Sequence, residues 1–139
     1  MTRIEVTHDI AACQRLRRTV FIEEQGVSEA DEVDGLDETA IHLVARDGDR
    51  PVGTARLLVK GTTGKIGRVC VLAEKRGTGL GAGLILAALD ELRRQPGLTN
   101  AYLGSQSHAT GFYEKLGFVI EGDEFIDAGI PHRHMRRAL

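Results

Sequence analysis

The sequence predicts a mixed α/β fold, in which a largely antiparallel sheet contains one parallel strand pair joined by a helical crossover. Two alternating strand patterns flank Asp47 and Gly48, a dipeptide typical of hairpin turns. An apolar run at 66–72 leads through a glycine-rich turn into a helical pattern, so the next strand is expected to return parallel to that run. With 139 residues, of which 42% are hydrophobic, the chain suits one compact domain over residues 1–139.

The N-terminal half predicts a strand, a helix and a meander. Asp9 is the expected N-cap of a helix whose apolar residues Ile10, Cys13, Leu16 and Val20 recur at helical spacing. Periodicity is then lost over residues 23–40. The other elements expected here are strands over 4–7, 41–46 and 51–59 and a turn over 60–65.

The C-terminal half predicts the crossover and a closing hairpin. The helix after the glycine turn is expected to end near Arg94, because Gln95, Pro96 and Gly97 do not easily continue it. The elements expected in order are a central strand over 66–72, that helix, a strand over 100–104, a short helix over 108–116 with Gly117 at its C′ position, and hairpin strands over 118–124 and 132–137.

The glycine-rich turn from Arg76 to Ala82 is the most informative segment. A glycine loop that opens a helix presents unpaired backbone N–H groups and a positive dipole end, which together suit a phosphate or diphosphate. A P-loop would need Lys and then Ser or Thr after its last glycine, and the chain has Ala82 and Gly83 there. A dinucleotide fingerprint fits Gly77, Gly79 and Ala82, but the strand that follows the helix ends without the required acid. A purely structural turn is the remaining alternative.

Two motifs together resemble the GNAT superfamily of acetyl-CoA-dependent N-acetyltransferases. VLAEKRGTGLG matches the family's cofactor loop through Arg76, Gly79 and Gly81, with Ala73 where proline is common. QSHATGFYEKLGF matches a later family segment through Tyr113, although Gln106 replaces the usual asparagine. The resemblance implies a mixed, mostly antiparallel sheet of six or seven strands, with one parallel and splayed pair and helices on both faces.

The resemblance also implies how the cofactor is held and used. Backbone groups of Val69 and Val71 would pair with the pantetheine arm of acetyl-CoA, and transfer to a primary amine would be direct, which disfavours Cys70 as an acetylated nucleophile. Tyr113 would act as the general acid that protonates the departing thiolate, with packing against the core as its alternative role. The residues expected to cradle the diphosphate are Arg76, Gly77, Thr78, Gly79, Leu80, Gly81 and Ala82.

Removal of the amine proton needs a base, and the sequence offers several without singling one out. The carboxylates and imidazoles considered are Glu23, Glu24, His42, His108, Glu124, His132 and His134. His132 and His134 share a strand face but have no identified third ligand, so no metal is expected.

An acidic segment over residues 23–38 carries eight carboxylates and no Lys or Arg, and it either is a solvated loop or attracts a small cationic amine. The segments VFIEEQ, DGLD, GRV and GIPHRHM resemble the ElaA-like branch of the GNAT proteins. The candidate acceptor-site residues are Gln25, Asp34, His42, Arg68, His108 and His132.

Composition bounds the remaining possibilities. A net charge of −2 argues against a nucleic-acid binder, and no apolar run or leader suggests a membrane or secretory protein, so the cytoplasm is the expected location. Cys13 and Cys70 are expected to be small buried hydrophobes. Edge strands at Ile4 and His132 would permit a homodimer. The alternatives are an acyl-homoserine-lactone-synthase-like acyltransferase, for which the chain is short and lacks tryptophan, and a non-catalytic acetyl-CoA sensor.

Overall fold

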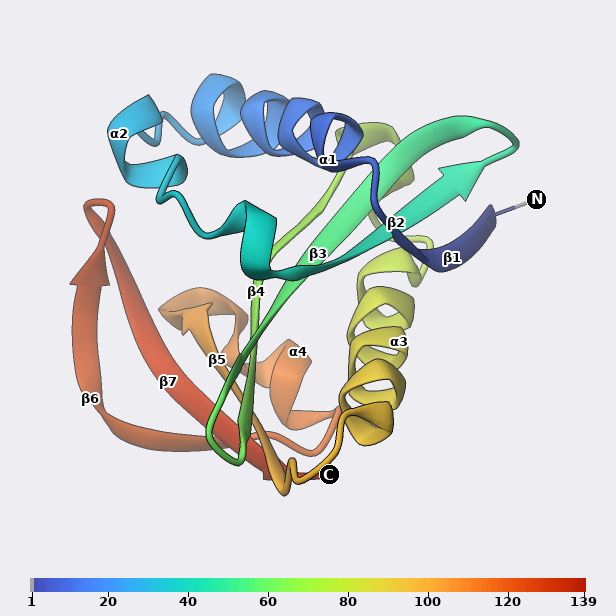
Figure 1. Cartoon of the computed structure of the whole chain (residues 1–139). Coiled ribbons are helices and arrows are strands. Elements are labelled where there is room, and N and C mark those ends of the chain that lie inside the picture. The colour runs from blue at the N-terminus through green and yellow to red at the C-terminus, as the bar shows by residue number, and fades with distance from the viewer. Residues whose placement is uncertain (1) are drawn as a thin grey trace.

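The computed structural model describes residues 2–139, and these form one seven-stranded sheet in the order β1-β2-β3-β4-β5-β7-β6 (Figure 1). Every neighbouring pair is antiparallel except β4 and β5, which are parallel. The predicted mixed sheet with one parallel pair is therefore confirmed. The strands are β1 Thr2–Thr7, β2 Ile41–Asp47, β3 Arg50–Lys60, β4 Thr63–Val71, β5 Asn100–Gln106, β6 Val119–Asp127 and β7 Ile130–Ala138.

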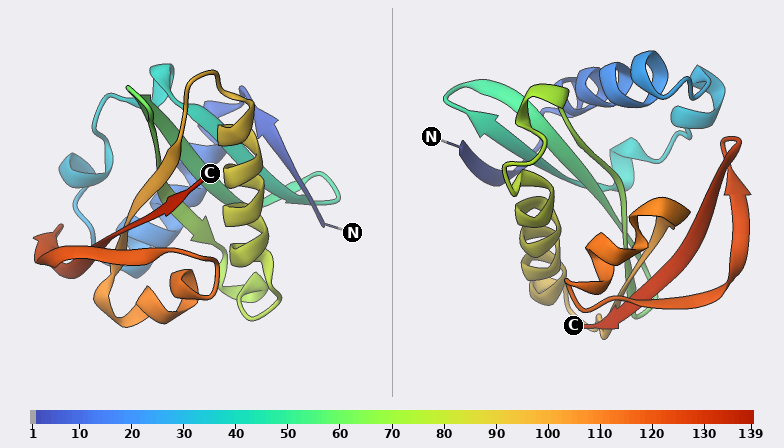
Figure 2. Two further views of the ribbon diagram at one scale, coloured as in Figure 1. Left: turned by 90° about the horizontal axis from the view of Figure 1, so that it is seen from below. Right: turned by 180° about the vertical axis from the view of Figure 1, so that it is seen from behind.

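The helices cover both faces of the sheet (Figure 2). On one face, Cys13, Leu16 and Val20 of the first helical segment pack on Val44 and Cys70. On the other face, α3 packs its apolar side against the larger core, because alternate residues of each strand point to opposite faces. The helical elements are α1 Ile10–Arg17, π-helix η1 Arg18–Glu24, α2 Glu29–Glu32, η2 Asp37–Thr39, η3 Ala73–Lys75, α3 Leu80–Arg94, η4 Ser107–Ala109 and α4 Thr110–Glu114.

Local signals placed most elements correctly. The Asp9 carboxylate accepts a hydrogen bond from the Ala12 N–H and caps α1 as predicted. The helix expected over 108–116 is divided into η4 and α4, and α4 ends at Glu114 with Lys115 as its C-cap. Gly117, with φ +91°, lies in the turn that follows, where the Phe118 N–H donates to the Tyr113 carbonyl. The turn expected over 60–65 is narrower, since β3 runs to Lys60 and β4 starts at Thr63. Both cysteines are buried free thiols, as predicted.

The closing hairpin differs from the prediction. Its strands reach Asp127 and resume at Ile130, so only Ala128 and Gly129 form the turn, with φ of +51° and +77°. Two positive φ angles are what a tight hairpin turn needs, and alanine gives no sequence signal for that conformation. β7 lies between β5 and β6, so His132 is not on an edge strand. The edges are β1 and β6, so of the two expected edge strands only the one at Ile4 is an edge, and dimerisation stays a prediction.

Candidate active site

The parallel pair β4–β5 opens into a gap beyond its first four residues. Pairing runs from Thr63 with Asn100 to Ile66 with Leu103 and then stops, although both strands continue. On its other side β4 stays paired with β3, and the Leu72 N–H donates to the Val52 carbonyl at 2.9 Å. Because successive residues of a strand point their backbone groups to opposite sides, Val71 directs its N–H and carbonyl toward the gap.

A backbone irregularity marks the same stretch of β4. The register with β3 shifts between Thr54 and Arg56, and Arg68, opposite this shift, has φ +51°. A non-glycine residue in the left-handed region is strained, and such strain concentrates at functional sites. The side chain of Arg68 is held by hydrogen bonds to the Glu32 carbonyl at 3.1 Å and the Asp34 carboxylate at 3.3 Å.

The glycine-rich turn follows the open end of β4 and leads into the N-terminus of α3. Gly77 and Gly79 have φ of +77° and +85°, which only glycine adopts without strain. Gly79 caps α3 without any side-chain hydrogen bond, and the Thr78 hydroxyl turns away to donate to the Lys75 carbonyl at 2.5 Å. The first N–H groups of α3, from Leu80 to Ala82, therefore lack intrahelical acceptors, and the N-cap residue Gly79 supplies no side-chain acceptor for them.

Arg76 is engaged rather than free. Its Nε donates to the Val71 carbonyl at 3.1 Å, and its guanidinium pairs with the Glu24 carboxylate at 2.9 Å. Glu24 is the last residue of the π-helix, so this ion pair bridges the cofactor loop and the segment that follows α1. The neighbouring Gln25 makes a second bridge, because its side-chain oxygen accepts a hydrogen bond from Gln106 at the end of β5 at 3.3 Å.

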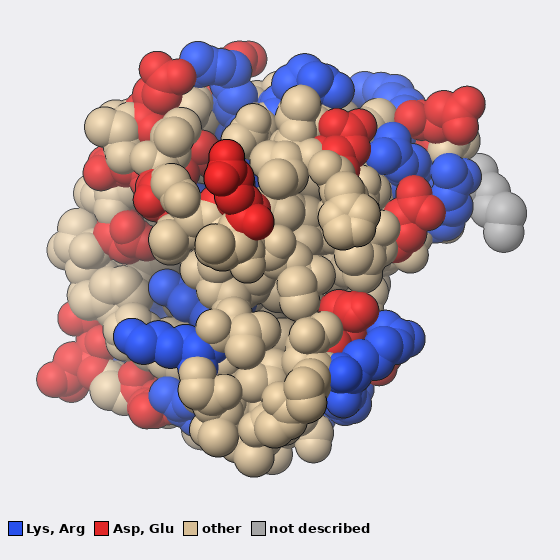
Figure 3. Space-filling view, in the orientation of Figure 1, with Lys and Arg blue, Asp and Glu red and all other residues tan. Residues whose placement is uncertain are grey.

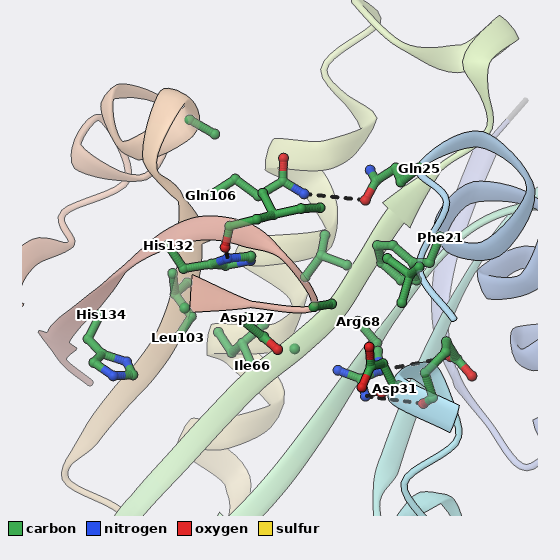
Figure 4. Close-up of a pocket in the computed structure, with 18 of the residues that line it drawn as sticks. Phe21, Gln25, Asp31, Ile66, Arg68, Leu103, Gln106, Asp127, His132 and His134 are labelled. Atoms are coloured by element: carbon green, nitrogen blue, oxygen red, sulfur yellow. Dashed lines mark hydrogen bonds and ion pairs between the residues drawn. The ribbon is translucent and has the colours of Figure 1, made fainter. Parts of the chain in front are cut away.

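A cavity of about 350 Å³ adjoins the gap between β4 and β5 (Figure 4). Phe21 of the π-helix and Gln25, which follows it, contribute one wall, while Phe125 and His132 contribute another from the β6–β7 hairpin. The volume is in the range of small-molecule sites. The cavity also exposes Val69, so it reaches the predicted cofactor strand.

Tyr113 projects from α4 into this cavity. Its ring packs edge-on against Phe112 and Phe118, with centroid separations of 4.9 and 6.2 Å. Burial raises the pKa of Tyr113, so its hydroxyl keeps its proton at neutral pH. The packing role and a proton-donor role are therefore compatible in one side chain.

The acidic segment is largely neutralised by two buried arginines, Arg17 and Arg56, together with the partly exposed Arg68. The Arg17 guanidinium, 1% exposed, donates to Glu32 at 2.5 Å and to both oxygens of Asp37 at 3.0 and 2.6 Å. Arg56 makes a two-pronged pair with Asp34 at 2.7 and 2.8 Å, and the hydrogen bond from Arg56 lowers the pKa of Asp34 to about 2.

This network limits the field that the acidic segment exerts, because five of its eight carboxylates are paired with arginines. Glu24 and Glu29 are also paired, with Arg76 and Arg18. Figure 3 shows acidic side chains along the side that carries α2 and β6, with basic groups near them, and further acidic and basic groups interspersed on the opposite side. The number of carboxylates in the segment does not by itself indicate the strength of its electrostatic field, because the arginines that balance these charges lie outside the segment.

The predicted acceptor-site residues divide into two groups. Gln25, Arg68 and His132 line the cavity. Asp34 and His42 do not line it: Asp34 is bound to Arg56, and His42 is 2% exposed with its Nε2 2.8 Å from the Asp37 carbonyl. His108 lies outside the cavity, with its Nε2 2.8 Å from the Gln106 side-chain oxygen.

Sequence reasoning missed several cavity residues. Phe21, Phe125 and Asp127 carry no motif by themselves, and only the π-helix and the closing hairpin bring them together. Phe21 lies within VFIEEQ, and that segment was the signal that pointed to this wall. Among residues 2–139 there is no group of three or more His, Cys, Asp or Glu that could hold a metal ion, and no helix is long and apolar enough to cross a bilayer.

Comparisons with known proteins agree with this architecture. A family model described as an acetyltransferase (GNAT) domain matches residues 11–139. An uncharacterized protein, YyaT, from Bacillus subtilis is 42% identical over 140 residues, covering 99% of this chain and 94% of its own length.

Two crystal structures extend the likeness to the fold. An acyl-CoA N-acyltransferase from Pseudomonas aeruginosa superposes with a TM-score of 0.91 at 33% identity, covering 99% of this chain and all of its own. ElaA from Escherichia coli superposes with a TM-score of 0.88 at 28% identity, covering 99% of each chain. The chain therefore belongs to the GNAT acetyltransferase family and is an acyltransferase.

Proposed function

We propose that the protein transfers an acetyl group from acetyl-CoA to a primary amine by direct attack within a ternary complex. The observation that carries this proposal is the gap between β4 and β5, which has a glycine turn at its open end and a small-molecule cavity beside it. A thioester in the gap would meet an amine in the cavity. Membership of the GNAT family supports acetyl-CoA as the co-substrate, and the Pseudomonas relative is itself an acyl-CoA N-acyltransferase.

Acetyl-CoA fits this site in two parts. The pantetheine arm would lie along β4, where Val69 borders the cavity and Val71 turns its backbone into the gap. The diphosphate would lie over residues 77–82, held by the first N–H groups of α3 and by the dipole of the helix. Arg76 would reach the diphosphate by exchanging its pair with Glu24.

The reaction requires one new bond, one broken bond and, for an acceptor that binds as an ammonium, three proton movements, because the nitrogen loses two protons and the thiolate gains one. The amine nitrogen attacks the thioester carbonyl, a C–N bond forms, and the C–S bond breaks as the tetrahedral oxyanion collapses. The departing thiolate takes a proton from Tyr113, a residue that lines the cavity. The nitrogen loses one proton to a base before attack and a second proton as the intermediate collapses, and this second proton restores the hydroxyl of Tyr113.

The acceptor is proposed to be a small amine that binds as a cation. Asp31 and Asp127 line the cavity, and within residues 2–139 neither carboxylate has an ion-pair partner. Glu32, in contrast, is committed to Arg17. The cytoplasm stays the proposed location, where the two free thiols would remain reduced.

The test is release of free CoA with a panel of amines, comparing wild type with Tyr113→Phe. Loss of a general acid is expected to lower kcat by about 10²-fold or more. No hydrogen bond to the Tyr113 hydroxyl exists among the described residues, so stability and the calorimetric affinity for CoA should match wild type.

Full activity of Tyr113→Phe would refute the assigned role. CoA binding without turnover of any amine would instead indicate a sensor module. Turnover only with an acyl chain on a carrier protein would indicate the homoserine-lactone-synthase-like alternative.

A further inference from the structure

Of the five histidines in the chain, only His132 and His134 line the cavity. Both project from β7 on the same face of the sheet, two residues apart. Two carboxylates considered from sequence are engaged elsewhere: Glu24 pairs with Arg76, and Glu124 accepts a hydrogen bond from the Ser107 hydroxyl at 2.7 Å. Of the bases considered from sequence, those that line the cavity are therefore the two imidazoles.

The backbone determines the tautomer of His132. Its Nδ1 lies 2.7 Å from the carbonyl oxygen of Ile130, and a carbonyl oxygen can only accept a hydrogen bond. Nδ1 must therefore carry the proton. A neutral imidazole has one N–H, so Nε2 of His132 holds a lone pair that is able to accept a proton.

The hairpin holds this imidazole in place. The Ala128–Gly129 turn brings Ile130 to the start of β7, and His132 is registered opposite Gln106 of β5 and Phe125 of β6. The ring of Phe125 packs beside the imidazole with a centroid separation of 5.7 Å. Figure 4 shows His132 directed into the cavity from the wall that faces Phe21 and Arg68.

His134 lacks a comparable constraint. Its Nδ1 makes a hydrogen bond with the Tyr102 hydroxyl, which is able to donate or accept, so this contact does not determine which nitrogen is protonated. The ring is also stacked on Phe125, with a centroid separation of 4.0 Å, and on Tyr102. These contacts suit a wall residue.

We propose that His132 is the general base, and that its Nε2 takes the proton from the acceptor amine. The inference rests on the proposed acetyl transfer and names the residue which that reaction needs. The N–H bond breaks, the electron pair stays on nitrogen for attack on the thioester carbonyl, and the imidazolium then donates from both nitrogens, with Nδ1–H still bound to Ile130.

The electrostatic surroundings of His132 are mixed. Its own strand adds His134, while β5 adds only neutral groups, Leu103, Gly104 and Gln106. The charged residues that face the cavity from the other elements are Lys65 and Arg68 of β4, Asp31 and Glu32 of α2, and Asp127 of β6.

The first experiment reads the tautomer without any substrate. Nitrogen-15 NMR of the neutral imidazoles is expected to show His132 protonated at Nδ1 and unprotonated at Nε2, with the signals assigned by their loss in His132→Gln. A His132 signal protonated at Nε2 would overturn the proposal, whatever the protein acetylates.

The second experiment measures kinetics against pH. In wild type, kcat/KM for a strongly basic amine should fall on acidification, because a protonated imidazole cannot accept the proton of the amine. His132→Gln should lower kcat by about 10²-fold at pH 7, and its kcat/KM should no longer show this fall on acidification. The activity of the variant should recover as pH approaches the pKa of the amine. His8→Gln, the same change at an exposed histidine before α1, should behave as wild type.

Binding separates the failure of this proposal from failure of the proposed function. His132→Gln should keep the CoA affinity and melting temperature of wild type, because its imidazole lies on the acceptor side. If His132→Gln keeps the wild-type kcat and the same fall of kcat/KM at acidic pH, the role of His132 is refuted while acetyl transfer stands. Absence of turnover in wild type itself, with His132 protonated at Nδ1, would refute the proposed function instead.

Discussion

Asp37 is the residue whose replacement most directly tests the role of the acidic segment. Its carboxylate, 13% exposed, accepts from Gln14 at 3.0 Å, from two nitrogens of Arg17 at 3.0 and 2.6 Å, and from Arg56 at 3.2 Å. Asp37→Asn keeps the shape but removes the charge. The guanidinium groups of Arg17 and Arg56, which are 1% and 5% exposed, would then lose the negative charge that they share.

The expected cost follows from this burial. Removing one partner of a buried ion pair costs about 3–5 kcal/mol, because the remaining charge stays desolvated. Glu32 and Asp34 continue to compensate the two arginines, so the lower end, about 3 kcal/mol, is expected. A chain of 139 residues has an unfolding entropy of about 0.3 kcal/mol/K, so the melting temperature should fall by roughly 10 °C.

The effect should depend on pH in one direction. Burial by itself would raise the pKa of Asp37, but hydrogen bonds from Arg17 and Gln14 outweigh it and hold the pKa below its ordinary value. A carboxylate with a lowered folded-state pKa stabilises the fold above its unfolded pKa and loses this effect as pH falls through the folded value. The difference between wild type and Asp37→Asn should be constant from pH 7 to about 5 and shrink below about pH 4.

Equilibrium unfolding in denaturant measures the difference, with Asp31→Asn as the matched control. Asp31 is an exposed carboxylate of the same acidic segment without an ion-pair partner among residues 2–139, so its replacement should change stability by less than about 0.5 kcal/mol. If Asp37→Asn costs no more than Asp31→Asn, the segment is a solvated loop and the network does not hold it.

Two further substitutions probe the cofactor side. Gly79→Ala and Gly79→Glu should each lower the stability by about 1–2 kcal/mol, because a residue with a Cβ is strained at φ +85°. No further cost is expected, since this Cβ meets no atom within 4 Å. Only the glutamate should also abolish calorimetric CoA binding, and equal affinity of both variants would place the diphosphate elsewhere. Glu24→Gln should bind CoA up to about 5-fold more tightly by releasing Arg76 from an exposed ion pair, with Glu23→Gln as the control. Weaker binding by Glu24→Gln would show that Glu24 supports the cofactor rather than competing with it.

The cofactor side was predictable because its signals are contiguous. The strand, the turn and the helix N-terminus occupy one run of the chain, and the positive φ of Gly77 and Gly79 is a local requirement. The acceptor side was less predictable because its charges are balanced across the fold. The carboxylates of one segment meet arginines from α1, β3 and β4, and no local pattern in the sequence records that pairing.

The closing hairpin shows the same difference at the level of one turn. Ala128 takes a φ of +51° that the sequence does not announce, and the resulting two-residue turn aligns β7 between β5 and β6. This alignment carries His132 from an expected edge to the wall of the cavity.

The sequence by itself determined the order of strands and helices, the glycine turn at the N-terminus of α3 and the family to which they point, since each depends on residues close together in the chain. Only the tertiary structure decided which carboxylates are neutralised, which imidazoles face the acceptor and which nitrogen of His132 is protonated. Those properties arise from contacts between distant segments, where burial and hydrogen-bond partners, rather than residue type, determine charge and proton position.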